Sequence, residues 1–219
     1  MVVAAPGARS SRPTDGRGDV LAVVLAGGAG SRVGGADKGL LRLCGRPLVE
    51  HVLERLRPQC DRVLIIANRN IDAYARYAPV AHDGNAGYAG PLAGLAAAFG
   101  FLEANRHALP AWLPTVPVDC ADLPGDLVER LHTGLFEQAD ARCAYVRRKG
   151  RSQPLFALYR IDDAAAWHAS AQGALRQHAS PMRWHAEMGA IAIDFDDAIS
   201  AFHNLNTPEE FRDYERTHG

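Results

Sequence analysis

An apolar run followed at once by a glycine-rich, cationic loop constrains this chain more than any other feature. Val20 to Ala26 is apolar without alternation, which is typical of a strand buried on both faces of a parallel sheet. The loop behind it combines Arg32 and Lys38 with glycines at positions 27, 28, 30, 34 and 35. Because glycine lacks a Cβ, backbone N–H groups can approach phosphate oxygens closely. The segment predicts a polyphosphate site at the carboxyl edge of an α/β sheet.

Two common phosphate-binding loops do not fit this segment. The dinucleotide fingerprint G-x-G-x-x-G is half met, since Val33 stands where the third glycine belongs. The next predicted strand, Val63 to Ala67, ends in Asn68, where that fold places an acidic residue for the ribose. A P-loop needs Gly-Lys-Ser/Thr, whereas Lys38 is followed by Gly39. A glycine-rich turn without a ligand is the remaining alternative, and five glycines with two cations argue against it.

Composition narrows the class of protein. At 219 residues and 47% hydrophobic, the chain can bury one sizeable core. Its net charge of -1 argues against a nucleic-acid-binding surface. Four cysteines without C-x-x-C spacing indicate reduced thiols in a cytoplasmic protein, and no apolar stretch is long enough for a membrane span. Residues 1–18 are rich in Ala, Gly, Ser, Pro and Arg, and we expect a disordered tail there.

The order of elements indicates a parallel sheet with covering helices, because strand and helix patterns alternate through two thirds of the chain. We expect helices from Pro47, over 71–77, over 91–103 and from about Leu123, the last capped by Asp122, and strands over 63–67, ending about 83, and over 112–118. A hairpin follows, with strands 143–146 and 155–159 around a polar turn at 147–152. Helices over 162–170 and 173–179, a strand over 191–195 and a helix with a Thr207–Glu210 capping box complete the prediction.

The segment from Leu25 to Leu40 resembles the signature of the molybdenum cofactor guanylyltransferases, the MobA family; wider relatives have a looser loop ending in Pro-Lys. Matches continue at 67–69, 90–94, 117–119, 153–159 and 204–210, while Val33 replaces the usual Met. The resemblance implies an α/β fold of the three-layer Rossmann-like nucleotidyltransferase type with a mostly parallel central sheet. It implies one domain over 19–219, with a GTP-binding half (about 19–140) and a molybdopterin-binding half (141–219).

The same resemblance implies a reaction. GMP would pass from GTP to the phosphate of Mo-molybdopterin, giving molybdopterin guanine dinucleotide and pyrophosphate with Mg²⁺ as cofactor. Implied partners are other molybdenum-cofactor biosynthesis proteins and apo-molybdoenzymes, in the cytoplasm. Two alternatives stay open: a sister nucleotidyltransferase that uses CTP or a sugar phosphate, and a non-catalytic GTP-binding module that delivers the cofactor.

Three side chains are candidates for catalysis. Arg32 and Lys38 can neutralise a leaving pyrophosphate through charge-assisted hydrogen bonds, although Arg32 could also be a solvated surface arginine. Asp119 follows a predicted strand, so its carboxylate at the sheet edge suits Mg²⁺ shared with phosphate oxygens. The alternative for Asp119 is a helix N-terminal Asp, a role that Asp122 fits better. Cys120 beside Asp119 is expected to be incidental.

The remaining candidates follow from the resemblance. It assigns GTP contact to Leu25, Ala26, Gly27, Gly28, Gly30, Lys38, Asn68, Asp83 and Asp119, although Asn68 and Asp83 could be ordinary turn residues. It assigns the molybdopterin side to Gln153, Asn204 and Asn206, and Asn204 or Asn206 could alternatively bind Mg²⁺ through its carbonyl oxygen. The basic turn Arg147, Arg148, Lys149 and Arg151 either attracts the pterin phosphate or is a solvated hairpin turn.

Overall fold

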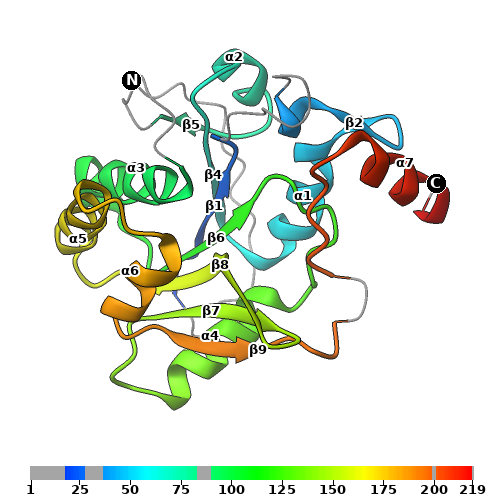
Figure 1. Ribbon diagram of the computed structural model, residues 1–219. Coiled ribbons are helices and arrows are strands. Elements are labelled where there is room, and N and C mark those ends of the chain that lie inside the picture. The colour runs from blue at the N-terminus through cyan, green and yellow to red at the C-terminus, as the bar shows by residue number, and fades with distance from the viewer. Residues whose placement is uncertain (1–17, 28–36, 83–89, 199–200, 219) are drawn as a thin grey trace.

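A computed structural model describes residues 18–27, 37–82, 90–198 and 201–218, and a seven-stranded sheet forms its centre (Figure 1). The strand order is β5-β4-β1-β6-β8-β7-β9. β8 runs antiparallel to β6 and β7, and the other neighbours in this sheet pair in parallel. The bounds are β1 Leu21–Leu25, β4 Arg62–Ile66, β5 Val80–Ala81, β6 Trp112–Pro117, β7 Cys143–Arg148, β8 Arg151–Arg160 and β9 Ile191–Asp194. The predicted mostly parallel sheet is confirmed.

The direction in which successive strands are placed in the sheet reverses at β1. The chain first adds β4 and then β5 on one side of β1, and it then crosses to add β6 on the other side. In open α/β sheets such a switch point opens a crevice at the carboxyl ends of the strands, where ligands bind. The segments that follow β1, β4 and β6 therefore leave the same part of the sheet edge.

Helices cover both faces of the sheet, which gives the predicted three layers. One buried cluster unites the sheet with α1 and α4, and another unites its opposite face with α3, α5 and α6 (Figure 1). The helices are α1 Leu48–Leu56, α2 Ile71–Tyr74, α3 Pro91–Ala104, α4 Leu127–Glu137, α5 Ala164–Arg176, α6 Pro181–Glu187 and α7 Pro208–His218, with 3-10 turns at Lys38–Leu40, Arg57–Gln59 and Arg106–Ala108. No helix of the described part of the chain is long and apolar enough to cross a membrane.

A third buried cluster joins the C-terminal helix α7 to the segment just after Lys38. Its core consists of Leu43, Leu48, Ala121, Leu205 and Phe211. The small hairpin of β2 (Arg42–Leu43) and β3 (Arg46–Pro47) lies beside α7 (Figure 1), and the Cys44 N–H donates to Glu215 Oε1 at 2.9 Å. Segments from the two ends of the chain are thus held together near the sheet edge.

Two predictions of helix ends are wrong, one at a helix cap and one at a glycine. The prediction that Asp122 caps the helix from Leu123 is wrong: α4 begins at Leu127 with Asp126 at its N-cap. Asp122 accepts a hydrogen bond from Tyr214 Oη at 2.7 Å instead, so its carboxylate anchors α7.

The region from 162 to 187 also differs from its prediction. The two helices expected over 162–170 and 173–179 are one helix, α5, because its buried face continues past Gly173 through Ala174. Helix α6 was not predicted, although the sequence holds a signal for it: Pro181 follows Ser180, whose Oγ accepts from the Arg183 N–H at 3.1 Å.

The hairpin of β7 and β8 is confirmed, with longer strands than predicted. The turn is reduced to Lys149 and Gly150, at φ 48° and 70°, so most of the predicted polar turn is strand. The predicted tail, apart from Gly18, lies outside the described residues.

Candidate functional site

Three side chains from distant parts of the chain meet at the carboxyl edge of the sheet. Lys38 Nζ lies 3.1 Å from Asp119 Oδ2, and it donates to Asn206 Oδ1 at 2.5 Å. Lys38 starts the 3-10 turn after the glycine-rich loop, Asp119 follows β6, and Asn206 precedes α7. The Lys38 and Asp119 side chains are each 20% exposed, so the ion pair is shielded yet open to a ligand.

The segment Asn204–Asn206 is fixed to the residues after β6 by its backbone. The Leu205 N–H donates to the Asp119 carbonyl at 2.7 Å, and Asn204 forms an antiparallel bridge with Cys120. The predicted capping box then holds the start of α7: Glu210 Oε2 accepts from the N–H groups of Asn206 and Thr207 at 2.5 and 2.8 Å. The Asn206 side chain is therefore presented from an anchored backbone.

The predicted nucleotide-contacting residues that the structure describes follow neighbouring strands. The Ala26 N–H donates to the Ile66 carbonyl at 2.8 Å, and the Val118 N–H donates to the Leu25 carbonyl at 3.1 Å. A Cβ added to Gly27 would lie 3.5 Å from Asn68 Nδ2. The segment Leu25–Gly27 thus lies between Asn68 on one side and the residues before Asp119 on the other. Four predicted site residues lie outside the described residues: Gly28, Gly30, Arg32 and Asp83.

Gln153 lies toward the same edge of the sheet. It is near the start of β8, which runs antiparallel to β6, so this end of β8 lies near the carboxyl end of β6. Thr115 Oγ1 donates to the Leu155 carbonyl at 2.9 Å, which ties the two strands together there. Gln153 is half-buried. Gln153 therefore lies on the β8 side of Asp119.

The basic hairpin turn is partly neutralised within the protein. Arg147 Nε and Nη2 both donate to the Asp194 carboxylate at 2.6 Å, and this guanidinium lowers the pKa of Asp194. The Lys149 N–H donates to Asp196 Oδ1 at 2.5 Å. These contacts favour the interpretation of a solvated, internally paired turn over a phosphate-attracting patch.

The donor set around Lys38 fits a hard divalent cation. A carboxylate oxygen of Asp119 and an amide oxygen of Asn206 converge on one cationic group, and oxygen is the ligand that Mg²⁺ prefers. Within the described ranges no group of three His, Cys, Asp or Glu side chains could hold a metal by itself. A cation here would need phosphate oxygens to complete its coordination, as Mg²⁺ commonly does.

Sequence reasoning missed the contacts of Asp37, the residue before Lys38. Tyr74 Oη donates to Asp37 Oδ1, and Asn70 Nδ2 donates to Asp37 Oδ2 at 3.0 Å. Tyr74 is fully buried, and burial together with the Asp37 carboxylate raises the pKa of its hydroxyl. The place of Asp37 in the glycine-rich motif was a sequence signal that this residue matters. Its partner Tyr74 gave no such signal, because an aromatic residue on a short helix looks like an ordinary core residue.

Cys120 is buried, and burial raises the pKa of its thiol. The thiol stays protonated at neutral pH, which agrees with its predicted incidental role.

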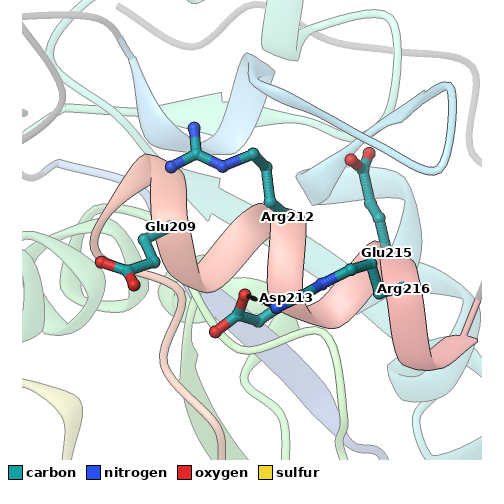
Figure 2. A pocket seen from close by; sticks show the side chains of 5 residues that line it. All are labelled: Glu209, Arg212, Asp213, Glu215 and Arg216. Atoms are coloured by element: carbon teal, nitrogen blue, oxygen red, sulfur yellow. Dashed lines mark hydrogen bonds and ion pairs between the residues drawn. The ribbon is translucent and has the colours of Figure 1, made fainter.

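A pocket on α7 is separate from these contacts. Figure 2 shows its lining side chains: Glu209, Arg212, Asp213, Glu215 and Arg216. Arg216 Nη2 and Asp213 Oδ1 form an ion pair at 2.5 Å within this helix. The lining is entirely charged and includes no candidate site residue, so we assign the pocket no ligand.

Comparisons with known proteins identify a family model and curated relatives that cover most of the chain. The model of the MobA-like NTP transferase domain matches residues 22–187. A molybdenum cofactor guanylyltransferase of Shewanella loihica is 38% identical over 190 residues, covering 86% of this chain and 92% of that protein. One of Vibrio parahaemolyticus is 38% identical over 192 residues, covering 88% and 93%.

Solved structures share the fold. Molybdopterin-guanine dinucleotide biosynthesis protein A from Archaeoglobus fulgidus superposes with a TM-score of 0.69 at 24% identity, covering 90% of this chain and 97% of that one. CMP:2-keto-3-deoxy-manno-octonic acid synthetase complexed with CTP gives 0.64 at 13% identity, covering 91% and 98%. At these identities the likeness speaks for the nucleotidyltransferase fold alone.

Proposed function

The chain belongs to the molybdenum cofactor guanylyltransferases of the MobA-like NTP transferase family, and from this we propose that it transfers GMP from GTP to the phosphate of Mo-molybdopterin. An oxygen of the pterin phosphate attacks the α-phosphorus of GTP and forms a new P–O–P bond. The bond between the α- and β-phosphates breaks, and pyrophosphate leaves with its electron pair. The observation that carries the proposal is the meeting of Lys38, Asp119 and Asn206 at the switch point of the sheet.

We assign the triphosphate to Lys38, with the glycine-rich loop and Arg32 beside it. Such a reaction needs positioning and charge neutralisation more than covalent help from the protein. A hydrogen bond from an ammonium group to a phosphate oxygen stays strong in a half-buried site, because little water competes for either group. In the structure this ammonium pairs with Asp119 and Asn206. Binding GTP gives Lys38 anionic phosphate partners and releases the two oxygens.

We assign Mg²⁺ to Asp119, with the Asn206 carbonyl oxygen as a second ligand. Both oxygens face the same cation position, which is the arrangement that a site completed by phosphate oxygens needs. When bound there, Mg²⁺ would withdraw charge from the phosphates and stabilise the leaving pyrophosphate. Asp119 and Asn206 hold that position from two separate segments, one after β6 and one before α7.

We assign guanine and ribose contacts to Leu25, Ala26, Gly27, Gly28, Gly30, Asn68 and Asp83. Guanine offers adjacent N–H donors, which a carboxylate or amide oxygen can accept. Support comes from the adjacency of Gly27 and Asn68 at the ends of β1 and β4. We assign Gln153 and Asn204 to the molybdopterin side, since Gln153 lies near the start of β8 at the same edge. The half 19–140 would then bind GTP, and the half 141–219 would bind Mo-molybdopterin.

The proposal gives the basic turn at 147–151 no role in binding, because Arg147 already pairs with Asp194. It includes a cytoplasmic location, which cell fractionation tests, and delivery of the product to apo-molybdoenzymes, which pull-down with those enzymes tests.

Nucleotide choice is the decisive test of this function. The protein is mixed with Mg²⁺, Mo-molybdopterin and one nucleoside triphosphate at a time, and pyrophosphate and the nucleotide joined to the pterin are measured. We expect a guanine dinucleotide and equal pyrophosphate from GTP. Transfer from CTP alone would make the chain a cytidylyltransferase, and GTP binding without pyrophosphate release would make it a delivery module.

A further inference from the structure

The carboxylate of Asp37 is used in an unusual way for its position. Asp37 is the N-cap of the 3-10 turn that begins at Lys38, yet its side chain makes no capping hydrogen bond to that turn. An Asp at an N-cap normally satisfies the free N–H groups of its own turn. Here Oδ1 accepts from Tyr74 Oη and Oδ2 accepts from Asn70 Nδ2 at 3.0 Å. Both carboxylate oxygens are thus committed to the segment after β4.

The donors to Asp37 are themselves fixed. Tyr74 is fully buried. Asn70 has a left-handed backbone (φ 51°), and its carbonyl accepts from the Ala73 and Tyr74 N–H groups at 2.9 and 3.1 Å. Asn and Asp adopt this conformation more readily than other non-glycine residues. Both donors therefore belong to one short element, since Asn70 is the N-cap of α2 and Tyr74 is its last residue.

The fit around Lys38 depends on this element. A Cβ at Gly39 would collide with Tyr74 Oη and lie 2.8 Å from Val118 Cγ2, so the turn is pressed against Tyr74. The Leu40 and Leu41 N–H groups donate to the Asp37 and Lys38 carbonyls, each at 3.1 Å. The position from which the Lys38 side chain leaves the backbone is consequently defined by the contact of Asp37 with Tyr74.

We propose that Asp37, Asn70 and Tyr74, here called the Asp37 clamp, position Lys38 for the GTP triphosphate and couple it to the nucleoside side of the site. Asn68, the candidate for nucleoside contact, lies two residues before Asn70 on the same short segment between β4 and α2. The clamp joins this segment to Lys38 across the sheet edge. The inference rests on the proposed function. None of the three residues touches the reacting atoms; each is a positioning residue.

Tyr74→Phe tests the clamp, because it removes one hydroxyl and keeps the buried ring. Tyr77→Phe is the matched control: Tyr77 lies three residues on, and burial and the Glu50 carboxylate, not Asp37, raise the pKa of its hydroxyl. We expect Tyr74→Phe to lower kcat/KM for GTP by about tenfold, since small misplacements of a positioned group are costly. KM for Mo-molybdopterin should stay unchanged, and Tyr77→Phe should stay within about twofold of the wild type.

Lysine labelling reports the position of Lys38 without any turnover. The chain has two lysines, Lys38 and the exposed Lys149 on the hairpin turn, so Lys149 is an internal reference. We expect Tyr74→Phe to raise the acetylation rate of Lys38 relative to Lys149 several-fold in the nucleotide-free protein. An unchanged Lys38 rate with unchanged GTP kinetics would overturn the inference, even if the melting temperature fell.

Exchanging the donor and the acceptor between positions 37 and 70 distinguishes loss of the clamp from loss of folding. Asn70→Asp places a carboxylate against the Asp37 carboxylate, so the donor is lost, and the added Asp37→Asn restores a donor facing an acceptor. We expect the single variant to lose kcat/KM for GTP and the double variant to recover it, at equal thermal stability. A stable double variant without recovery would overturn the clamp. If the wild type transfers no GMP, the proposed function fails, and the labelling experiment still decides whether the clamp positions Lys38.

Discussion

At the scale of single residues, the shielded polar side chains of the site each have a specific hydrogen-bond partner. Lys38 is shielded from much of the solvent and pairs with Asp119 and Asn206, whose oxygens are also the best candidates for Mg²⁺. Tyr74 is buried and directs its hydroxyl to Asp37. A buried polar group left without such a partner would cost about 1 to 3 kcal/mol. These pairings hold the Lys38 and Tyr74 side chains in the structure.

One buried histidine predicts a specific pH dependence of stability. His185 is fully buried beside Tyr159, 2.7 Å from Nε2 to the Tyr159 hydroxyl, and burial lowers its pKa to about 4. In the unfolded chain a histidine has a pKa near 6.5, so below that pH the unfolded state binds a proton that the folded state refuses. The free energy of unfolding should fall from about pH 6.5 to pH 4, by about 3 kcal/mol in total from this group.

Urea unfolding at several pH values between 7 and 4 measures this contribution. His185→Gln cannot titrate, so its stability should decline less steeply over that interval than the stability of the wild type. Parallel curves for the two proteins would mean that His185 does not contribute to the acid sensitivity.

At the scale of elements, the apolar patterns predict well and the caps decide the errors. The runs at 20–26, 63–67 and 112–118 are strands within one or two residues, since a buried parallel strand has a distinctive composition. Asp122 and Asp126 both precede the apolar face of α4, and only the packing of α7, through Tyr214 on Asp122, decides between them. Gly173 does not end α5, because tertiary packing outweighs its low helix propensity.

The start of α7 predicts a measurable coupling between a helix cap and the site. Glu210→Ala removes the carboxylate that accepts from the Asn206 and Thr207 N–H groups. We expect a loss of about 1 kcal/mol in the free energy of unfolding, typical of a lost cap. The GMP transfer rate should also fall, because Asn206 loses its backbone anchor. Urea unfolding and initial rates measure the two effects.

Glu209→Ala is the matched control for this prediction. Glu209 lies in the same first turn and loses the same charge near the helix N-terminus, but its side chain lines the α7 pocket (Figure 2). If both variants lose the same transfer rate, the effect comes from the charge at the helix N-terminus and not from the anchoring of Asn206.

At the scale of the whole molecule, distant segments complete one site. The shared sheet edge predicts that the glycine-rich loop and Asp119 meet, because parallel strands place their carboxyl ends together. The contact between Lys38 and Asn206, 168 residues apart, follows no spacing rule. It depends on α7 packing against Leu43 and Leu48. The clamp between Asp37 and Tyr74 depends in the same way on side-chain packing after β4. The architecture and the identity of the three residues that meet at the sheet edge were therefore predictable, and the side-chain contacts between the segments were not.

The most direct test of this account compares the two lysines of the chain. Lys38→Met and Lys149→Met each remove one ammonium and keep an apolar stem. Single-turnover formation of the guanine dinucleotide from GTP and Mo-molybdopterin, with Mg²⁺ present, measures the transfer step for each variant. We predict that Lys38→Met slows transfer by about 100-fold or more, as expected for the loss of a charge that stabilises the leaving group, while Lys149→Met transfers at the wild-type rate. Wild-type transfer by folded Lys38→Met would contradict the assignment of this edge of the sheet as the transfer site.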